Sequence, residues 1–173
     1  MAEHGPRILV FTGDGAGKTS AAMGKVLRLV ARGYTVAVVQ FMKHDADSGE
    51  IASLARLGVV VEQCGLGFVP APSAPRYAAH QAAAAAGLER ARQCVASHDA
   101  VVLDEVCGAV TAGLLSDAAV LDLLSGLEPH QVCICTGRGA SAALIAVADT
   151  VSSIACVKHA FDDGCRAQEG IER

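Results

Sequence analysis

The chain has 173 residues, 52% of them hydrophobic and 18% charged, and its formal net charge is −4. An acidic chain without basic clusters lacks the electrostatic footprint of a protein that binds nucleic acid. No apolar run approaches the roughly 18–20 residues of a membrane span, and the first apolar segment begins at Ile8, too early for a leader peptide. We therefore expect a cytoplasmic protein with no nucleic-acid or membrane partner, folded as a single domain over residues 1–173.

Six short apolar runs predict strands, because each is apolar on both faces and is bounded by residues that favour turns. The runs cover residues 7–12, 35–41, 59–64, 100–105, 131–137 and 151–157. Helical patterns lie between them at residues 18–31, 49–56, 77–96, 117–125 and 140–148. This alternation predicts a three-layer α/β fold with a mainly parallel six-stranded sheet flanked by helices. Because ligands of such folds bind at the carboxyl ends of the strands, we expect functional residues in the loops there.

The loop after the first predicted strand reads GDGAGKT and leads directly into the first predicted helix. Its glycines, Gly13, Gly15 and Gly17, let the backbone wrap closely, so that N–H groups and the helix N-terminus converge on an anion. Lys18 adds a positive charge, and the hydroxyl of Thr19 suits Mg²⁺. The pattern indicates a triphosphate-binding loop in a P-loop NTPase (RecA-like) fold, with an ordinary glycine-rich turn as the alternative.

A pair of acids follows the fourth predicted strand, in the run AVVLDE that ends at Asp104 and Glu105. P-loop proteins bring a carboxylate beside the metal in this way. We expect Thr19 and one of the two carboxylates to bind Mg²⁺, although two acids at a strand end can also form a turn that faces solvent.

Basic residues follow the last two predicted strands. Arg138, in the run CTGRGA, could neutralise a phosphate or a substrate carboxylate, or it could be a surface arginine at a tight turn. The run VKHAFDDG places Lys158, His159 and Asp162 where they could close one side of the same rim, unless it is a solvated loop. The proline-rich segment 65–77 is long and irregular, which favours a loop that faces the substrate.

Other chemistries lack support. The six histidines form no H-E-x-x-H or comparable spacing for zinc, and no G-x-S-x-G elbow occurs. The seven cysteines are odd in number, scattered and without a C-x-x-C pair, so we expect reduced thiols that mostly lie in the core.

The order of the motifs is more specific than any one of them. The chain carries FTGDGAGKTSAAMG, VAVVQFMK, GLGF, VVLDEVCGAVTAGLL, TGRGA, ADTV and VKHAFDDGCRAQEGIE, over nearly its whole length. In this it resembles the P-loop ATP:corrinoid adenosyltransferases, which also begin their phosphate loop with threonine, as at Thr12. The resemblance implies that the cobalt(I) of a corrinoid attacks the 5′ carbon of ATP and that the whole triphosphate leaves.

The resemblance also implies roles for individual residues. ATP would be bound by Gly13, Asp14, Gly15, Ala16, Gly17, Lys18, Thr19, Ser20, Gln40, Lys43 and Arg138. Mg²⁺ would be bound by Thr19 and Glu105, with Asp104 behind them. The corrinoid would contact Gly67, Phe68, Lys158 and His159, with Phe68 displacing the lower axial ligand of the cobalt.

The partners implied by the resemblance are an external electron donor, which reduces cobalt(II) to cobalt(I), and a second copy of the chain in a homodimer. The sequence departs from the family pattern at Asp14, Ala16 and Ser20, where the family usually has Asn, Lys and Thr, and this predicts weaker binding of ATP. Some members also carry a tryptophan where this chain has Pro70, and the chain contains no tryptophan.

Two other functions remain compatible with the residues. A P-loop kinase or NTPase would release ADP and would need a catalytic base or an arginine finger near the third phosphate. A non-catalytic module would bind nucleotide or corrinoid without turnover, as the departures at Asp14, Ala16 and Pro70 suggest.

Overall fold

The computed structural model describes residues 5–44, 49–160, 164–166, 168 and 170, so the predicted rim residue Asp162 lies outside the described residues. The strands are β1 (Arg7–Thr12), β2 (Val36–Gln40), β3 (Val60–Gln63), β4 (Ala100–Asp104), β5 (Val132–Thr136) and β6 (Thr150–Ser153). The helices are α1 (Lys18–Val30), α2 (Gly49–Arg56), α3 (Tyr77–Val95), α4 (Val106–Thr111), α5 (Asp117–Ser125) and α6 (Ala142–Val147).

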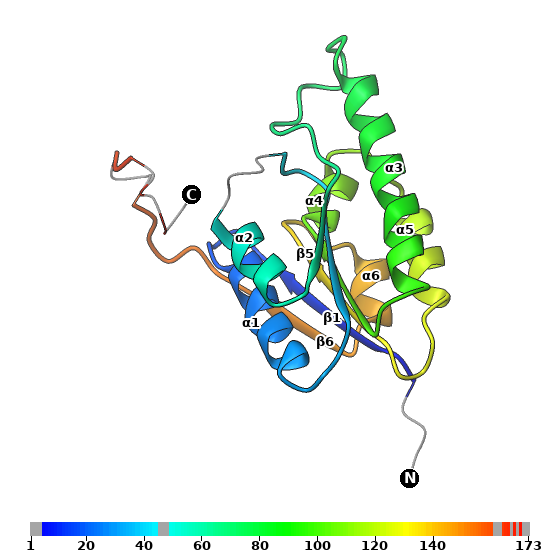
Figure 1. Cartoon of the computed structure of the whole chain (residues 1–173). Helices are drawn as coiled ribbons and strands as arrows, with labels where there is room; N and C mark the ends of the chain where they lie inside the picture. Colours follow the sequence, from blue (N-terminus) through cyan, green and yellow to red (C-terminus); the bar gives the residue numbers. More distant parts are fainter. Residues whose placement is uncertain (1–4, 45–48, 161–163, 167, 169, 171–173) are drawn as a thin grey trace.

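The six strands form one sheet in the order β3-β2-β4-β5-β1-β6 (Figure 1). Every neighbouring pair is parallel, which confirms the predicted α/β class. Parallel pairing places the carboxyl ends of all strands at one edge of the sheet, and the loops that leave this edge are therefore neighbours.

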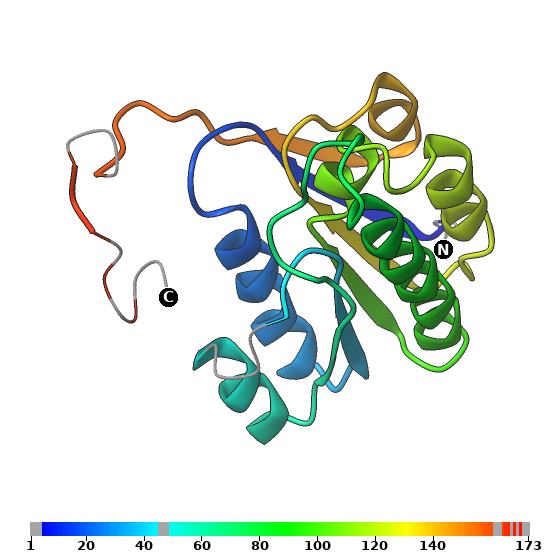
Figure 2. The ribbon, with the colours of Figure 1, turned by 90° about the horizontal axis from the view of Figure 1, so that it is seen from above.

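Helices cover both faces of the sheet, with α1 and α2 on one side and α3 to α6 on the other (Figure 2). Along β2, Val36 and Val38 pack with α1 and α2, whereas Ala37 and Val39 pack with α3. This two-sided burial is the physical reason that the strands read as continuous apolar runs rather than alternating ones.

The sequence prediction was wrong at two places. It assigned no helix to α4, a six-residue helix whose N-cap, Glu105, makes no side-chain capping bond and has a left-handed backbone with φ 61°. It also extended the last strand to residue 157, whereas β6 ends at Ser153. Beyond that point Ile154 donates from its N–H to the carbonyl of Thr12 at 2.8 Å, and the chain then leaves the sheet.

All seven cysteines are free, as the sequence predicted, and those at 94, 107, 133 and 135 are buried, whereas Cys156 and Cys165 are exposed. Burial raises the pKa of the Cys107 thiol to about 12, so this thiol stays protonated and unreactive at neutral pH. Within the described part of the chain, no helix is both long and apolar enough to cross a membrane.

Candidate active site

The loops after β1, β2, β4 and β5 meet at the carboxyl edge of the sheet. The first of them, residues 13–17, connects β1 to the thirteen-residue helix α1. Gly13 and Gly17 have φ of 97° and 105°, a left-handed conformation that is favourable only for glycine. A loop of this shape aims backbone N–H groups at the space before the helix, where the partial positive charge of the helix N-terminus also acts.

The segment after β6 supports this loop from behind. The N–H of Gly15 donates to the carbonyl of Ile154 at 2.8 Å. A side chain on Gly15 would collide with the backbone of Ala155, at 2.5 Å from its carbonyl oxygen. Glycine is therefore required here for close approach, and the loop is held against the edge strand before any ligand binds.

Lys18 is 7% exposed, and its Nζ donates to the carbonyl of Gly15 at 2.8 Å. The bond holds the ammonium group inside the loop, where it has few solvent contacts. A cation in this place would be electrostatically attractive to a triphosphate, because both the lysine and the loop amides would bind anionic oxygens.

Asp104, at the end of β4, has no exposed surface and accepts three hydrogen bonds. Its Oδ1 accepts from the hydroxyls of Thr19 and Thr136, both at 2.8 Å, and its Oδ2 accepts from Nε2 of Gln40 at 3.2 Å. Because the Thr19 hydroxyl donates a hydrogen bond to Asp104, the oxygen lone pairs of Thr19 remain available for a cation.

Glu105 follows Asp104 in the left-handed conformation, and its N–H donates to the Thr136 hydroxyl at 2.9 Å. Burial raises the pKa of the Glu105 carboxyl, and the neighbouring Asp104 raises it further. The positive charges of Lys18, Arg138 and Lys43 lower the pKa of the Glu105 carboxyl, because they lie close enough to interact with it electrostatically.

The donors in this region suit Mg²⁺, which prefers oxygen ligands and usually takes only one or two protein carboxylates besides phosphates and water. The hydroxyl of Thr19 and the carboxylates of Asp104 and Glu105 are donors of this kind. Among the described residues, no group of three or more His, Cys, Asp or Glu side chains could hold a metal ion. The residues therefore fit a metal that arrives with phosphate oxygens better than a site made of protein ligands alone.

The other residues expected to bind ATP lie within the loop or around it. Asp14, Ala16 and Ser20 are exposed, and the exposed Arg138 reaches back to the carbonyl of Asp14 at 3.4 Å. Lys43 is half-buried and forms an ion pair of 2.6 Å with Glu50 on α2.

Gln40 is 1% exposed and lies behind Asp104, where its Oε1 accepts from Nε2 of Gln63 at 2.9 Å. Its side chain therefore faces Asp104 and Gln63 inside the protein, and a direct contact with ATP stays a prediction.

The segment 65–70 lies beside the loop after β2. Gly67 has φ 83°, and its N–H donates to the carbonyl of Met42 at 3.0 Å. The next residue, Phe68, is 94% exposed. A phenyl ring with so little contact to its own chain is available to a ligand that approaches from solvent.

The segment after β6 passes the phosphate loop at Ile154 and then runs away from the helices, as both ribbon views show (Figures 1 and 2). Lys158 is exposed and His159 is half-buried on this segment. Their predicted role in closing the rim remains a prediction.

Sequence reasoning missed three contributors to the site. These are the hydroxyl of Thr136, the amide of Gln63 and the carbonyl of Ile154, which contact Asp104, Gln40 and Gly15. Thr136 is the first residue of the TGRG run and could have been noticed there. The other two depend on which strands are neighbours, and no local pattern reports this.

Comparisons with known proteins place this geometry in context. The sequence model of the family described as ATP:corrinoid adenosyltransferase BtuR/CobO/CobP matches residues 4–173. The chain is 40% identical to the corrinoid adenosyltransferase CobA of Salmonella typhimurium over 95% of this chain and 84% of that protein. It is 38% identical to the corrinoid adenosyltransferase of Pseudomonas aeruginosa over 95% of this chain and 82% of that protein.

Among solved structures, the flagellar accessory protein FlaH from Methanocaldococcus jannaschii is similar with a TM-score of 0.53. The match has 12% identity and covers 87% of this chain and 71% of that one. At this level of identity the likeness concerns the fold alone, and it agrees with the predicted α/β architecture.

Proposed function

The chain belongs to the ATP:corrinoid adenosyltransferase family, whose members adenosylate corrinoids in cobalamin biosynthesis, and from this premise we propose how its own residues perform the transfer. The 5′-deoxyadenosyl group moves from ATP to the cobalt(I) of a corrinoid, and inorganic triphosphate leaves. The observation that carries this proposal is the phosphate cradle of residues 13–19, with Lys18 held inside it, at the carboxyl end of β1.

The transfer needs charge stabilisation rather than proton transfer. The electron pair of cobalt(I) forms the bond to C5′, while the electrons of the C5′–O bond move onto the triphosphate oxygen. The loop amides, Lys18 and Arg138 stabilise the negative charge that accumulates there. Groups that the fold already holds in place do not have to reorganise when the reaction occurs, so this stabilisation has no reorganisation cost. No general base is required, because no proton is removed from the nucleophile.

Mg²⁺ fits the oxygen donors at the end of β4 and the start of α1. We propose that Thr19 and Glu105 hold it, with Asp104 orienting the Thr19 hydroxyl through the 2.8 Å hydrogen bond. When bound, the ion neutralises part of the triphosphate charge. The chain itself orients the oxygen atoms that would bind the ion. The left-handed backbone of Glu105 and the hydrogen bond from its N–H to Thr136 fix the backbone from which the Glu105 side chain extends.

The proposed corrinoid side consists of Gly67 and Phe68, on the segment that follows β3. The exposed ring of Phe68 supports a role in pressing against the lower face of the corrinoid, which would remove the axial ligand and ease reduction by an external electron donor. Pro70 stands where some members have tryptophan, so in this chain Phe68 would do this without that aromatic neighbour.

We further propose a cytoplasmic homodimer. The use of ATP and the seven free cysteines suit the cytoplasm. Exposed apolar side chains on α6 and on the edge strand β6, at Ile145, Val147 and Val151, give a second copy of the chain a surface to cover. Light scattering at micromolar concentration tests this, and a monomer would contradict it.

Hydrolysis of ATP is the second candidate function. The half-buried carboxylate of Glu105, which directly follows Asp104 beside the cradle, is the observation that favours it, because a carboxylate in this place could accept a proton from water.

One assay separates the two functions. The purified protein is incubated anaerobically with Mg-ATP and chemically reduced cob(I)alamin, and the visible spectrum is followed. We expect a light-sensitive adenosylated corrinoid that forms only when both protein and ATP are present. Consumption of ATP without a cobalt–carbon bond would overturn the proposed function.

A further inference from the structure

A row of polar side chains crosses the carboxyl end of the sheet from β5 to β3. Asp104 on β4 lies in its middle, and Gln40 on β2 and Gln63 on β3 continue it outward. The distances are 3.2 Å from Gln40 Nε2 to Asp104 Oδ2 and 2.9 Å from Gln63 Nε2 to Gln40 Oε1. Phosphate binding accounts for Asp104 through Thr19, but it gives no reason for Gln63 at the outer end of the row.

The row has a fixed direction. Two hydroxyls and one amide donate to Asp104, an arrangement suited to a carboxylate, which only accepts hydrogen bonds. Gln40 must therefore turn its NH₂ group toward Asp104, and this leaves its oxygen facing β3. Position 63 must in turn supply a donor, since an acceptor there would meet another acceptor. The acceptor character of Asp104 thus requires, through the orientation of the Gln40 amide, that residue 63 donate a hydrogen bond.

Gln63 is also the last residue before the loop that carries Phe68. Three backbone hydrogen bonds hold the start of this loop to the last residue of β2 and to the loop after it. They are Cys64 N–H to Gln40 carbonyl (2.9 Å), Gly65 N–H to Lys43 carbonyl (3.2 Å) and Gly67 N–H to Met42 carbonyl (3.0 Å). Gln40 therefore takes part in both sets of contacts, with its side chain on Asp104 and its carbonyl on the loop.

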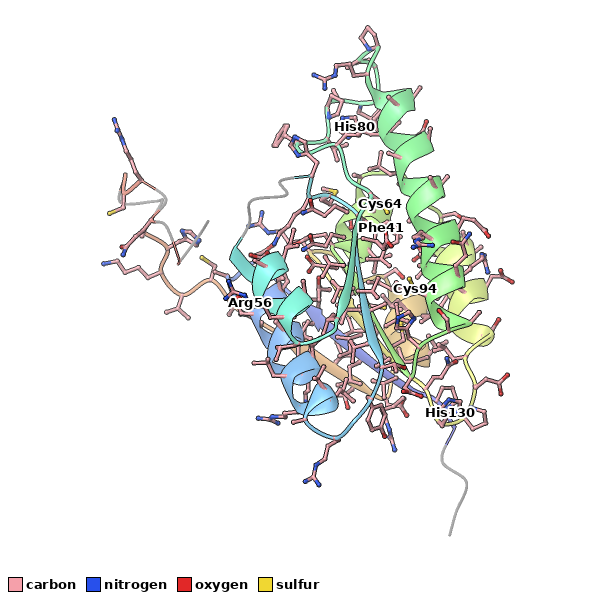
Figure 3. The ribbon with its side chains drawn as sticks, in the orientation of Figure 1. Phe41, Arg56, Cys64, His80, Cys94 and His130 are labelled. Atoms are coloured by element: carbon pink, nitrogen blue, oxygen red, sulfur yellow. The ribbon has the colours of Figure 1, made fainter. Side chains whose placement is uncertain are left out.

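Helix α3 closes the base of the loop from the side. A Cβ on Gly87 would lie 2.8 Å from Cβ of Cys64 and 3.3 Å from Cε1 of Phe41, so the helix approaches as closely as a glycine allows. Figure 3 shows Phe41 and Cys64 next to one another at this place. Beyond this packed base the loop becomes more exposed and reaches Phe68, so the position of the ring depends on how the base of the loop is held.

We propose that Gln63 is a positioning residue for the corrinoid side of the site. Through Gln40 it links the loop that carries Phe68 to the carboxylate of Asp104, and so it sets the position of the corrinoid relative to the triphosphate. The proposal rests on the proposed function, because it takes the corrinoid as the ligand of Phe68. It predicts that position 63 needs a hydrogen-bond donor. Loss of the donor should weaken the binding of corrinoid and leave the binding of ATP nearly unchanged.

Three substitutions of similar length test the donor requirement. Gln63→Lys keeps a donor toward Gln40, Gln63→Glu replaces it with an acceptor, and Gln63→Met removes the polar group. Gln93→Met, at an exposed glutamine on α3 whose side-chain oxygen accepts from Arg90, is the matched control. None of the four replaces a residue that donates a hydrogen bond to Asp104.

Two dissociation constants are measured for each variant, that of cob(II)alamin by visible absorbance in the presence of Mg-ATP and that of ATP alone by calorimetry. We expect Gln63→Met and Gln63→Glu to weaken corrinoid binding by about tenfold, the usual effect of leaving a polar partner unpaired. Gln63→Lys and the control should stay within about threefold of the wild type. The dissociation constant of ATP should change less than about twofold in all four.

Three results would overturn the proposal alone. These are wild-type corrinoid binding by Gln63→Glu, an equal loss in Gln63→Lys and Gln63→Glu, and a loss of ATP binding as large as that of corrinoid binding. The last would mean that the residue merely supports the fold. A wild-type protein that binds no corrinoid at all would instead overturn the proposed function, and the proposal with it.

Discussion

The two sides of the candidate site differ in how far they are built before a ligand arrives. On the phosphate side, Asp104 and Thr136 have no exposed surface and Lys18 is 7% exposed, and each is held by a hydrogen bond of 2.8 Å. On the proposed corrinoid side, Phe68 is 94% exposed. The comparison teaches that the fold itself positions the groups proposed to stabilise charge, whereas the ring of Phe68 has few contacts within its own chain.

This difference has an energetic consequence. A change on the phosphate side removes donors that are paired within the protein, so it should alter stability or metal binding as well as catalysis. A change at Phe68 removes a side chain that contributes little to the folded state, so it should alter only the handling of the corrinoid. The following predictions break or sharpen this contrast.

The largest effect is expected for Lys18→Ala. Removal of the only buried cation of the phosphate loop should lower kcat about 10²–10³-fold, the range observed when a preorganised charge-stabilising donor is lost. Arg28→Ala, at an exposed cation on the same helix, is the control and should retain full activity. Steady-state kinetics with cob(I)alamin measure both, and unchanged turnover in Lys18→Ala would remove the lysine from the mechanism.

Thr136→Val should have the next largest effect. It leaves the N–H of Glu105 without its partner and removes one of three donors from Asp104, at a cost of about 1–3 kcal/mol in the free energy of unfolding. Binding of Mn²⁺ in place of Mg²⁺, followed by electron paramagnetic resonance with ATP present, should weaken. Thr136→Ser keeps the hydroxyl and should restore both properties; if it behaves like valine, shape rather than hydrogen bonding matters here.

Phe68→Ala tests the other side of the comparison. Because the ring is 94% exposed, the melting temperature should not change, and transfer to chemically prepared cob(I)alamin should be nearly normal. Adenosylation that starts from cob(II)alamin and a reductant should fall about tenfold. Val157→Ala removes another side chain that is 94% exposed and is the control. Equal losses in both assays would contradict the role in displacing the axial ligand.

Asp14→Asn should have the smallest effect. The exposed carboxylate of Asp14 places a negative charge on the phosphate loop, so its removal should tighten ATP binding about two- to fivefold at low salt. The gain should shrink as the ionic strength rises, because exposed charges are screened. Calorimetric titration at two salt concentrations measures it, and a gain independent of salt would point to a cause other than charge.

The phosphate side could be predicted from sequence because its parts are local. The glycines, Lys18 and Thr19 stand in one run between a strand and a helix, and the continuous apolar strands indicate a parallel sheet. The partners of Asp104 could not be predicted in this way. Thr136 and Gln40 reach it only because β5 and β2 flank β4, and strand order is a property of the whole chain.

The sequence prediction was wrong about two elements, α4 and β6, and both errors have physical reasons. The helix α4 has only six residues and contains Gly108, and it begins after Glu105, whose backbone is left-handed. The sequence therefore shows neither a capping residue nor a periodic apolar pattern that would predict this helix. The last apolar run continues past Ser153, and the N–H of Ile154 still donates to Thr12 of β1, but the carbonyl of Ile154 accepts from Gly15 of the phosphate loop and the chain then leaves the sheet. In that segment the contact with the loop prevailed over strand propensity.

The central claim is that the cradle of residues 13–19 holds the triphosphate as one leaving group. Phosphorus NMR of the products, taken during anaerobic turnover with Mg-ATP and cob(I)alamin, tests it most directly. The account predicts one inorganic triphosphate for each cobalt–carbon bond formed. ADP and phosphate in proportion to turnover would show that the cradle serves cleavage at the third phosphate, and this would contradict the account.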